Sequence, residues 1–398
     1  MGYQFETLDD LKVRGKRVLV RADLNVPMRH GSITDLTRIQ RSAGTIRELS
    51  EHGARVIVLA HFGRPNGKRV ADMSLAPVAV ALGKVLGRQV AFANDSVGTA
   101  AGQVVEALDD GDVAMLENLR YHEQEEANDN AFAKRLAGLG DLYVNDAFSC
   151  AHRAHASVDA LARQLPTAAG RSMQAELSAL NNALSAPERP LGAVVGGAKV
   201  STKLDVLSSL ISKVDVLVIG GGMANTFLFA GGADVGKSLC EPDLAETARN
   251  INTKASLAHC EIVLPEDVVV ARELKEGSAS EVVHVDDVPK DAMILDVGPQ
   301  ASETIVTRLS TCKTIVWNGP LGAFEVFPFD AATNAVARAV AALCREGKVL
   351  AVAGGGDTVA ALTHAQVADD FSHLSTAGGA FLEWLEDKEL PGIAALAR

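Results

Sequence analysis

The stretch KVLAVAGGGDTVAALTHA, residues 348–365, holds three local signals that together decide the fold class. A short apolar run comes first, three glycines follow it, and an alanine-rich segment typical of a helix completes the stretch. Runs that are apolar throughout are typical of parallel strands buried on both faces, and glycines allow a tight turn into the next helix. The stretch therefore predicts a strand, a glycine turn and a helix, which is the repeating unit of an α/β fold.

Similar apolar runs recur along the chain and alternate with helical segments rich in Ala and Leu. They lie at residues 18–20, 56–59, 113–116, 142–144, 193–195, 216–219, 262–264, 293–295, 314–316 and 349–352. These are too many strands for one ordinary sheet, so the pattern predicts two sheets of about five or six strands each. We expect an α/β fold with two Rossmann-like, three-layer domains whose sheets are mostly parallel.

One internal boundary is visible in the sequence. The segment QAELSALNNALSA, residues 174–186, predicts a helix, and the two prolines of the APERP that overlaps its end break that helix. We expect an N-terminal domain over residues 1–170, an interdomain helix or hinge over residues 171–188, and a C-terminal domain over residues 189–371. The length of 398 residues agrees with about two domains.

The chain is acidic overall, with a net charge of −12, but its charge is unevenly distributed. The first 70 residues hold 13 Lys and Arg against 7 Asp and Glu, a net charge of +6, which leaves −18 for the rest. The acidic balance argues against a nucleic-acid-binding surface, because neutralising phosphates requires clustered Lys and Arg. A locally basic part in an acidic chain instead favours a small anionic ligand.

Cysteine usage and hydropathy exclude several further classes. The five cysteines are odd in number and never in C-x-x-C spacing, so neither a disulfide framework nor a zinc site is expected. The N-terminus lacks the apolar core of a secretory signal, and no stretch approaches about 18 uninterrupted apolar residues. We expect a cytoplasmic protein that binds neither membranes nor nucleic acid.

Nearly every predicted strand is followed by a polar or glycine-rich cluster. The clusters are RADLN, AHFGRP, ENLR, NDAFS, GGAK, GGGMAN, DVGP, NGPLG and GGGD. In open parallel sheets, ligands bind outside the carboxyl ends of the strands. We therefore expect these clusters to converge on two sites, one in each domain.

The clusters of the N-terminal domain are rich in arginine and histidine. Their polar residues are Arg21, Asp23, Asn25, Arg38, His61, Arg64, Arg120, His152, Arg153 and His155. Guanidinium groups bind phosphate and carboxylate through paired hydrogen bonds, so arginines at successive strand ends indicate a pocket for a small molecule with several negative charges. Surface salt bridges and satisfied loop histidines are the alternatives, and Asp23 and Asn25 could bind a substrate hydroxyl or cap the turn.

Two lysines follow the first strand of the C-terminal domain, in the sequence GGAKVSTK. Lys199 and Lys203 are four residues apart, which predicts that they lie on one face of a helix that begins after the strand. Two lysines near the positive end of a helix fit a polyphosphate.

The GGGD cluster and the NGPLGAFE segment add candidates for a nucleotide site. The glycines at residues 354–356 would let backbone N–H groups approach an anion closely. Asp357, which follows them, is either an ordinary helix N-cap or a ligand of a nucleotide-bound Mg²⁺. Glu325 could hold ribose hydroxyls, although a single Glu is usually just solvated.

One motif imitates a nucleotide-binding loop. Residues 231–238 satisfy the P-loop pattern G-x-x-x-x-G-K-[ST], with Lys237 and Ser238 at its end. A true P-loop needs a strand before it and a helix that starts at the lysine. Here the end of a predicted helix precedes the motif and Pro242 follows it closely, so we expect no P-loop ATPase. No G-x-G-x-x-G follows a strand either, which disfavours a dinucleotide oxidoreductase.

From end to end, the chain resembles the phosphoglycerate kinase family. The matching motifs, in the family's order, are RVLVRADLNVP with ITDLTRI, AHFGRP, ENLRYHEQEE, YVNDAF with AHRAHAS, GGAKVSTKLDVL, GGGMANTFL, WNGPLGAFE, GGGDT and SHLSTAGGAFLE. The resemblance implies two α/β domains that face a cleft, a helical hinge between them, and a C-terminal segment, residues 372–398, that returns to the N-terminal domain.

The resemblance also implies the reaction, its ligands and its residues. It implies a monomeric glycolytic enzyme that transfers a phosphoryl group reversibly between 1,3-bisphosphoglycerate plus ADP and 3-phosphoglycerate plus ATP, with Mg²⁺ bound to the nucleotide. The positions that match the family's phosphoglycerate site are Asp23, Leu24, Asn25, Arg38, His61, Phe62, Gly63, Arg64, Arg120 and Arg153. The positions that match its nucleotide site are Lys203, Asn318, Glu325, Gly355, Gly356, Asp357 and Thr358, with Asp357 at the magnesium position. The implied catalytic groups are Arg38, Lys199, Lys203, Gly355 and Gly378.

Four departures from the family's motifs are visible, and none removes a matched charged residue. Ala377 stands in place of a usual glycine, and Phe62 replaces a usual leucine. Ser149 and Cys150 replace Gly-Thr, and Arg171 and Ser172 replace an apolar pair. These are the positions at which this chain could differ locally from its relatives.

The implied chemistry needs no general base. The acceptor is a carboxylate whose pKa near about 4 leaves it ionised at neutral pH, so positioning and charge neutralisation must supply the catalysis. The two ligands are expected on different domains, which must therefore close on each other. A non-catalytic two-domain protein that binds a sugar phosphate is the alternative, but it leaves Lys199, Lys203, Glu325 and GGGDT without a task.

Overall fold

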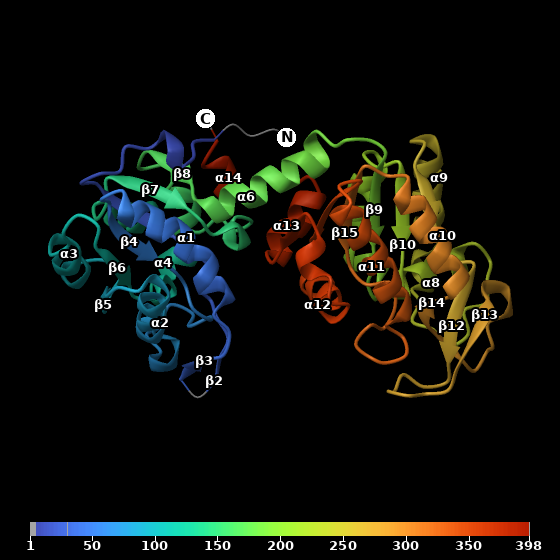
Figure 1. The fold of residues 1–398 in the computed structure, drawn as a ribbon. Coiled ribbons are helices and arrows are strands. Elements are labelled where there is room, and N and C mark those ends of the chain that lie inside the picture. The colour runs from blue at the N-terminus through green and yellow to red at the C-terminus, as the bar shows by residue number, and fades with distance from the viewer. Residues whose placement is uncertain (1–4, 30, 398) are drawn as a thin grey trace. The chain divides into compact units, whose positions relative to one another are not determined.

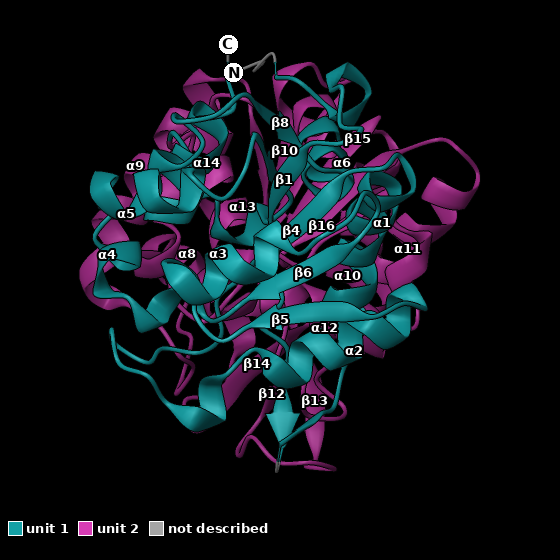
Figure 2. Cartoon of the chain, turned by 90° about the vertical axis from the view of Figure 1, so that its left-hand side faces the viewer, with its two compact units in different colours: residues 1–178, 389–398 teal, residues 179–388 magenta. Residues whose placement is uncertain are grey.

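The computed structural model describes residues 5–29 and 31–397, and the contacts divide the chain into two compact units (Figure 2). Unit 1 comprises residues 1–178 and 389–398, and unit 2 comprises residues 179–388. Each unit contains a six-stranded sheet whose neighbouring strands all run parallel (Figure 1). The predicted α/β class with two mostly parallel sheets is confirmed.

Unit 1 is built on a sheet with the strand order β5-β6-β4-β1-β7-β8. Its strands are β1 (Arg17–Arg21), β4 (Arg55–Leu59), β5 (Val90–Ala93), β6 (Val113–Leu116), β7 (Leu142–Asn145) and β8 (Thr167–Ala169), and a separate hairpin joins β2 (Met28–Arg29) to β3 (Ser32–Ile33). The helices are α1 (Thr37–Glu51), α2 (Ala76–Leu86), α3 (Thr99–Glu106), α4 (Glu123–Glu126), α5 (Asn130–Ala137), α6 (Arg171–Leu180) and α14 (Pro391–Ala394). Short helical turns are η1 (Leu8–Asp10), η2 (Ala71–Met73), η3 (Leu119–Tyr121), η4 (Phe148–Cys150) and η5 (Ala156–Ala160).

Helices cover both faces of this sheet. Val18 and Val20 of β1 belong to one buried cluster, together with Ile46 of α1. The intervening residue Leu19 belongs to a second cluster, together with Leu136 of α5. Alternate residues of a strand point to opposite faces, so the two clusters show that the sheet is buried on both sides. This is why its strands are apolar throughout in the sequence.

Unit 2 contains a parallel sheet with the strand order β11-β10-β9-β15-β16-β17 and a smaller antiparallel sheet with the order β13-β12-β14. The parallel strands are β9 (Leu191–Val195), β10 (Val216–Ile219), β11 (Glu261–Val263), β15 (Thr314–Asn318), β16 (Leu350–Gly354) and β17 (His373–Ser375), and the antiparallel ones are β12 (Asp267–Ala271), β13 (Ser280–His284) and β14 (Met293–Val297). The helices are α7 (Leu204–Ile211), α8 (Gly221–Ala230), α9 (Ala245–Leu257), α10 (Pro299–Ser310), α11 (Ala331–Arg345), α12 (Gly356–His364) and α13 (Gly378–Leu385). Short helical turns are η6 (Asn181–Ser185), η7 (Val200–Thr202), η8 (Pro242–Leu244), η9 (Val285–Asp287) and η10 (Ala368–Asp370).

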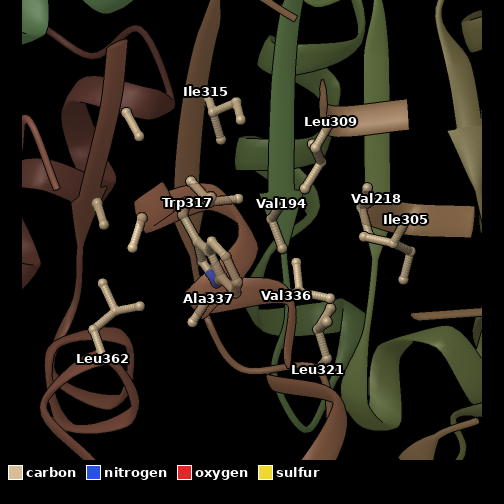
Figure 3. Close-up of a cluster of buried hydrophobic side chains, with 14 of the residues drawn as sticks. Val194, Val218, Ile305, Leu309, Ile315, Trp317, Leu321, Val336, Ala337 and Leu362 are labelled. Carbon is tan, nitrogen blue, oxygen red and sulfur yellow. The ribbon is translucent and has the colours of Figure 1, made fainter. Parts of the chain in front are cut away.

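Trp317 of β15 lies at the centre of the main buried cluster of unit 2 (Figure 3). Its indole N–H donates to the carbonyl of Gly319 at 2.7 Å, so this large side chain is buried without an unpaired polar atom. Ile305 and Leu309 of α10 and Val336 of α11 belong to the same cluster. The cluster therefore fastens α10 and α11 to one face of the parallel sheet.

One predicted strand belongs to a different sheet than expected. The run at residues 293–295 falls in β14, which pairs antiparallel with β12 outside the two parallel sheets. The three residues of this run are half-buried, and Ile294 packs against the buried cluster around Val268 and Val270 of β12, which is why the run is apolar. The strands that were not predicted from the sequence are β2, β3, β5, β8, β12, β13 and β17.

The segment that returns to unit 1 is shorter than the sequence indicated. Residues 372–388 belong to unit 2, because β17 pairs parallel with β16 and α13 packs against α7. Only residues from 389 onward join unit 1, where the backbone N–H of Gly392 donates to the carbonyl of Ala151 at 2.8 Å. The boundary expected at residue 372 is therefore corrected to residue 389.

The predicted interdomain helix is present as α6 followed directly by η6. Asp146 caps the start of α6, since its Oδ1 accepts the backbone N–H groups of Ser172 at 2.8 Å and Met173 at 3.2 Å. Arg171, one of the departures from the family's motifs, forms paired contacts with Asp9 at 2.7 and 2.8 Å and with Glu48 at 2.6 and 2.9 Å. These contacts replace apolar packing with an ion-pair network at this helix start.

Two expectations about the whole chain can be compared with the structure. All five cysteines are free thiols. Within residues 5–29 and 31–397, no helix is both long enough and apolar enough to cross a membrane.

The core of unit 2 provides a stability prediction. Leu309→Ala removes a fully buried side chain from the Trp317 cluster and should lower the free energy of unfolding by about 2–5 kcal/mol, because a cavity remains. The matched control is Leu257→Ala on α9, whose side chain is 78% exposed and should contribute less than about 0.5 kcal/mol. Urea unfolding followed by tryptophan fluorescence reports on unit 2, since both tryptophans lie there. Equal losses in the two variants would contradict the assigned core.

Candidate active site

The carboxyl ends of four neighbouring strands bring the N-terminal candidates together in unit 1. The order β6-β4-β1-β7 is continuous and parallel, so the segments that follow these strands meet at one edge of the sheet. We call this edge the arginine edge; it contains Asp23, Asn25, His61, Gly63, Arg120 and Arg153, together with Arg38 of α1.

Asp23 and Arg38 form an ion pair at the arginine edge. The Arg38 Nη1 contacts the two carboxylate oxygens of Asp23 at 2.8 and 2.6 Å. Ser149 also donates to Oδ2 of this carboxylate, at 2.6 Å. Asp35 starts α1 by accepting the backbone N–H of Thr37 at 2.7 Å, which places Arg38 in the first turn as the sequence indicated. Asp23 therefore holds Arg38, which is 39% exposed, at a defined position before any ligand binds.

Two asparagines fix the loop that carries His61, Phe62 and Gly63. Asn25 accepts the backbone N–H of Gly63 at 3.0 Å. Asn118 accepts the N–H of Phe62 at 3.1 Å and donates to its carbonyl at 2.7 Å. Asn25, a candidate partner for a ligand hydroxyl, therefore also holds this loop in place through its side-chain oxygen.

The charge at this edge depresses the pKa of the nearby histidines. Burial, together with Arg21, Arg120 and Arg153, lowers the pKa of His61 well below its usual value. Burial and the same arginines lower the pKa of His155 to about 4. Both rings are therefore neutral at physiological pH, so the arginines supply the positive charge that an anion would meet.

The remaining N-terminal candidates differ in how they can contribute. Leu24 is fully buried in the hydrophobic core, which leaves its backbone as the part that could meet a ligand. Arg64 is exposed, whereas Arg153 is half-buried and its Nε donates to His152 at 3.1 Å. Arg120 is 4% exposed and donates to the carbonyl of Gly63 at 2.8 Å.

The second half of the site lies at the carboxyl ends of the parallel strands of unit 2. Helices α12 and α13 begin directly after β16 and shortly after β17, which are neighbours in the sheet. A Cβ atom added to Gly378 would lie 3.7 Å from the backbone nitrogen of Gly356, so the two helix starts are adjacent. Gly355 caps α12 with a φ of 102°, which favours glycine. Two adjacent helix N-termini make a strong binding place for an anion.

Lys203 extends towards these glycines. Its Nζ donates to Oδ1 of Asn318, whose Nδ2 in turn donates to the carbonyl of Gly354 at 2.7 Å. Burial lowers the pKa of Lys203 to about 8, although Asp357 partly opposes this shift. A half-desolvated ammonium that faces two helix N-termini gains greatly when an anion arrives.

The two lysines do not share a helical face, so that prediction was wrong. Lys199 has an extended backbone with φ −138° and ψ 135° and is exposed, and Lys203 lies between η7 and α7. The side chain of Thr202 donates to the carbonyl of Lys199 at 2.8 Å, and Ser201 bonds to Glu241. These side-chain bonds compete with helix formation and delay the helix until residue 204.

The structure excludes one of the two interpretations left open for Asp357. The N-cap of α12 is Gly355, and the Asp357 side chain forms no capping hydrogen bond, so the N-cap interpretation is wrong. Asp357 is exposed and lines a cavity together with Glu325. A single carboxylate beside a phosphate-binding place fits Mg²⁺, which takes one or two protein carboxylates and completes its shell with water and phosphate oxygens. In the described part of the chain, no cluster of three or more His, Cys, Asp or Glu could hold a metal alone.

A cavity of about 360 Å³ extends from Asp357 into unit 2, and the sequence reasoning missed most of its apolar wall. The apolar residues at its wall include Ala198, Leu239, Val268, Leu274, Met293, Ile294 and Leu321. Its size and apolar walls suit a flat ring system, while Asp357 and Glu325 supply the polar end. The clusters GGAK, GGGMAN, DVGP and NGPLG and the candidates Glu325 and Asp357 mark parts of this cavity in the sequence. The other apolar wall residues were missed because they look like ordinary core residues in a sequence.

Two further candidate residues, Thr358 and Asn318, are buried and form hydrogen bonds within the site. Thr358 is fully buried, and its hydroxyl accepts the backbone N–H of Gly319 at 2.7 Å. Asn318 is 2% exposed, and its side-chain amide forms hydrogen bonds with Lys203 and with the carbonyl of Gly354. Both side chains therefore hold the glycine loops in place.

The imitation P-loop has no phosphate-binding structure. It begins at the C-terminal end of α8, and the backbone N–H of Lys237 donates to the carbonyl of Ala292 at 2.8 Å. Ser238 accepts the N–H of Ile294 at 2.8 Å. The loop therefore packs against β14, and the rejection of a P-loop is confirmed.

Comparison with known proteins adds independent evidence to this geometry. A sequence model of the family described as phosphoglycerate kinase matches residues 8–388. The phosphoglycerate kinases of Sinorhizobium fredii and Sinorhizobium medicae are 61% and 62% identical to the chain over 393 residues, which is 98% of each chain. The chain belongs to the phosphoglycerate kinase family.

Solved structures of the family agree with this assignment. The phosphoglycerate kinase from Coxiella burnetii has a TM-score of 0.93 and 44% identity, with 99% of both chains covered. The one from Pyrococcus horikoshii OT3 has a TM-score of 0.81 and 30% identity, with 98% of both chains covered.

Family membership establishes the reaction class. The chain is a kinase that transfers a phosphoryl group reversibly to a carboxylate acceptor in glycolysis, with 3-phosphoglycerate and ATP or ADP among its ligands. The alternative of a non-catalytic sugar-phosphate-binding protein is not favoured. A nucleotide-dependent kinase also implies Mg²⁺ bound with the nucleotide.

The lowered pKa of Lys203 predicts a pH dependence. Burial disfavours the ammonium, so Lys203 is charged below its pKa of about 8 and loses its proton as the pH rises through that value. We expect kcat/KM for ADP to fall above about pH 8, since this parameter reports ionisations of the free enzyme. Lys203→Arg, which stays charged, should abolish the fall.

Lys237→Ala is the matched control, because it changes the lysine of the imitation P-loop. It should keep both the activity and the pH profile of the unmodified protein. A fall above pH 8 that persists unchanged in Lys203→Arg would contradict the assignment to Lys203.

Proposed function

We propose that the arginine edge binds phosphoglycerate and that the paired helix starts of unit 2 bind the phosphates of ATP or ADP. The observation that carries this proposal is the meeting of α12, α13 and Lys203 beside a cavity that ends in Asp357 and Glu325. This part of unit 2 combines a polyphosphate site, a cavity for a ring system, and carboxylates for a metal and a ribose. The arginine edge supplies the complementary site for a small, multiply charged acceptor.

The arginine edge neutralises the acceptor, and its residues carry separate tasks in the proposal. Arg64, Arg120 and Arg153 bind the phosphate and carboxylate of phosphoglycerate, while Asp23 and Asn25 contact its hydroxyl. Arg38, held in position by Asp23, neutralises charge on the phosphoryl group in transit. Because the acceptor carboxylate is already ionised, no protein side chain needs to remove a proton.

The paired helix starts hold the donor. Backbone N–H groups of Gly355, Gly356 and Gly378 and the ammonium groups of Lys199 and Lys203 face the negative charge that spreads over the phosphoryl oxygens during transfer. Asp357 would hold Mg²⁺, which neutralises phosphate charge when bound with the nucleotide. Glu325 binds the ribose, and the apolar cavity takes the base.

The proposal includes a hinge and a setting for the reaction. Direct transfer requires the reacting atoms of the two ligands to approach within about 3–3.5 Å, so the helical run 171–188 serves as the hinge that allows it. We further propose a monomer in the cytoplasm, a reducing compartment in which the five free thiols remain reduced.

Arg38→Ala tests the proposed transition-state role. We expect kcat to fall about 100- to 1,000-fold with a modest change in KM, because the lost charge acts mainly on the group in transit. Arg47→Ala, on the exposed face of the same helix, is the matched control and should keep normal kinetics. Steady-state assays in both directions give the values, and a near-normal kcat for Arg38→Ala would remove Arg38 from the mechanism.

A further inference from the structure

Arg21 is a buried charge with no task in the proposed transfer. It ends β1 and is only 1% exposed. Its Nε donates to the hydroxyl of Ser157 at 2.8 Å, and its Nη1 donates to the carbonyl of Ala22 at 2.7 Å. Its Nη2 lies 3.0 Å from Nδ1 of His61. The last contact links Arg21 to the proposed phosphoglycerate site.

The chemistry of the two groups leaves one arrangement of protons. A guanidinium has only donors, so Nδ1 of His61 must accept the hydrogen bond from Arg21. A neutral imidazole has one donor and one acceptor, so its proton is then on Nε2. An imidazolium, or the other neutral tautomer, would place an N–H against the N–H of Arg21 at this distance.

We infer that Arg21 is a positioning residue that fixes His61 as the neutral tautomer with its proton on Nε2, so that the ring is a permanent hydrogen-bond donor to phosphoglycerate. The inference rests on the proposed function, because it gives His61 a defined task in that same site. The inference explains how His61 can bind an anion as a neutral ring.

Arg21 is itself held by a buried relay. The Ser157 hydroxyl that accepts from Arg21 donates to Oε1 of Glu125 at 2.6 Å, and the Ser157 backbone N–H donates to Oε2 at 2.9 Å. Glu125 is fully buried, and its attraction to Arg21 and its bonds to Ser157 oppose the rise in its pKa that burial causes. The guanidinium is thus fixed on one side by Ser157 and on the other by Ala22, which leaves Nη2 aimed at His61.

The surroundings of His61 oppose its protonation from every element that faces it. Arg21 approaches from β1, Arg120 from η3, and Arg153 and His155 from the segment after η4. The thiol of Cys150 in η4 lies 3.9 Å from Nδ1 and is a weak partner at most. These neighbours and burial lower the pKa of His61 well below its usual value, in agreement with a neutral ring.

A direct test is ¹⁵N NMR of the full-length protein labelled at its histidines. The coupling pattern of the ring nitrogens to the carbon-bound ring protons shows which nitrogen carries the proton, and His61→Gln assigns the signals. We expect His61 to show a protonated Nε2 and a bare Nδ1 throughout the range of about pH 5 to 8, in which histidine ordinarily titrates. A protonated Nδ1 or an imidazolium in this range would overturn the inference.

Variants of Arg21 connect the tautomer to binding. Arg21→Met removes the donor, so His61 should lose its fixed tautomer and the affinity for 3-phosphoglycerate, measured by calorimetry, should fall about ten-fold. Arg21→Lys retains a donor, so it should restore part of the tautomer preference of His61 and part of the affinity for 3-phosphoglycerate. If the Met variant does not fold, the Lys variant and the spectrum of the unmodified protein test whether Arg21 fixes the tautomer of His61.

The outcomes separate the inference from the proposed function. A folded Arg21→Met protein whose His61 keeps the pattern of the unmodified protein would overturn the positioning role, even if affinity falls. Failure of the unmodified protein to bind 3-phosphoglycerate, with His61 in the expected tautomer, would instead contradict the proposed function.

Discussion

Two anionic molecules have to be bound and brought into reaction, and they repel each other. Both half-sites have to offset this repulsion. Phosphoglycerate and a nucleotide each carry several negative charges, and the group in transit adds charge to its oxygens. The protein therefore has to supply positive charge or aligned dipoles at both ligands. The parallel sheets permit this, because they place the starts of several loops and helices at one edge.

The two units offset this repulsion in different ways. Unit 1 uses arginines, and Arg21 and Arg120 are buried deeply enough to be fixed by backbone carbonyls. In unit 2 the proposed site combines the N-termini of α12 and α13 with the half-desolvated Lys203 and the exposed Lys199. The first 70 residues are basic, whereas the phosphate site that we propose in the acidic remainder relies partly on backbone dipoles, which do not appear in a charge count.

Sequence patterns predicted the parallel sheets and the residues at strand ends, because both depend on short-range signals. The continuous apolar runs identified β1, β4, β15 and β16, and the clusters after them contain the polar residues that the structure brings together. Details that depend on distant partners could not be predicted. Lys199 is extended because Thr202 and Ser201 form side-chain bonds, one of them to Glu241. Asp357 is not the cap of α12 because Gly355 takes that position, and β17 holds residues 372–388 in unit 2 through pairing with β16.

The account as a whole depends on whether the chain transfers a phosphoryl group directly between the two ligands. The most direct measurement is a coupled assay of ATP formation from 1,3-bisphosphoglycerate and ADP with Mg²⁺, using the full-length protein. We predict that ATP and 3-phosphoglycerate appear in equal amounts and only when both substrates are present. Binding of both ligands without ATP formation would contradict the account, because it would describe a binding protein rather than a kinase.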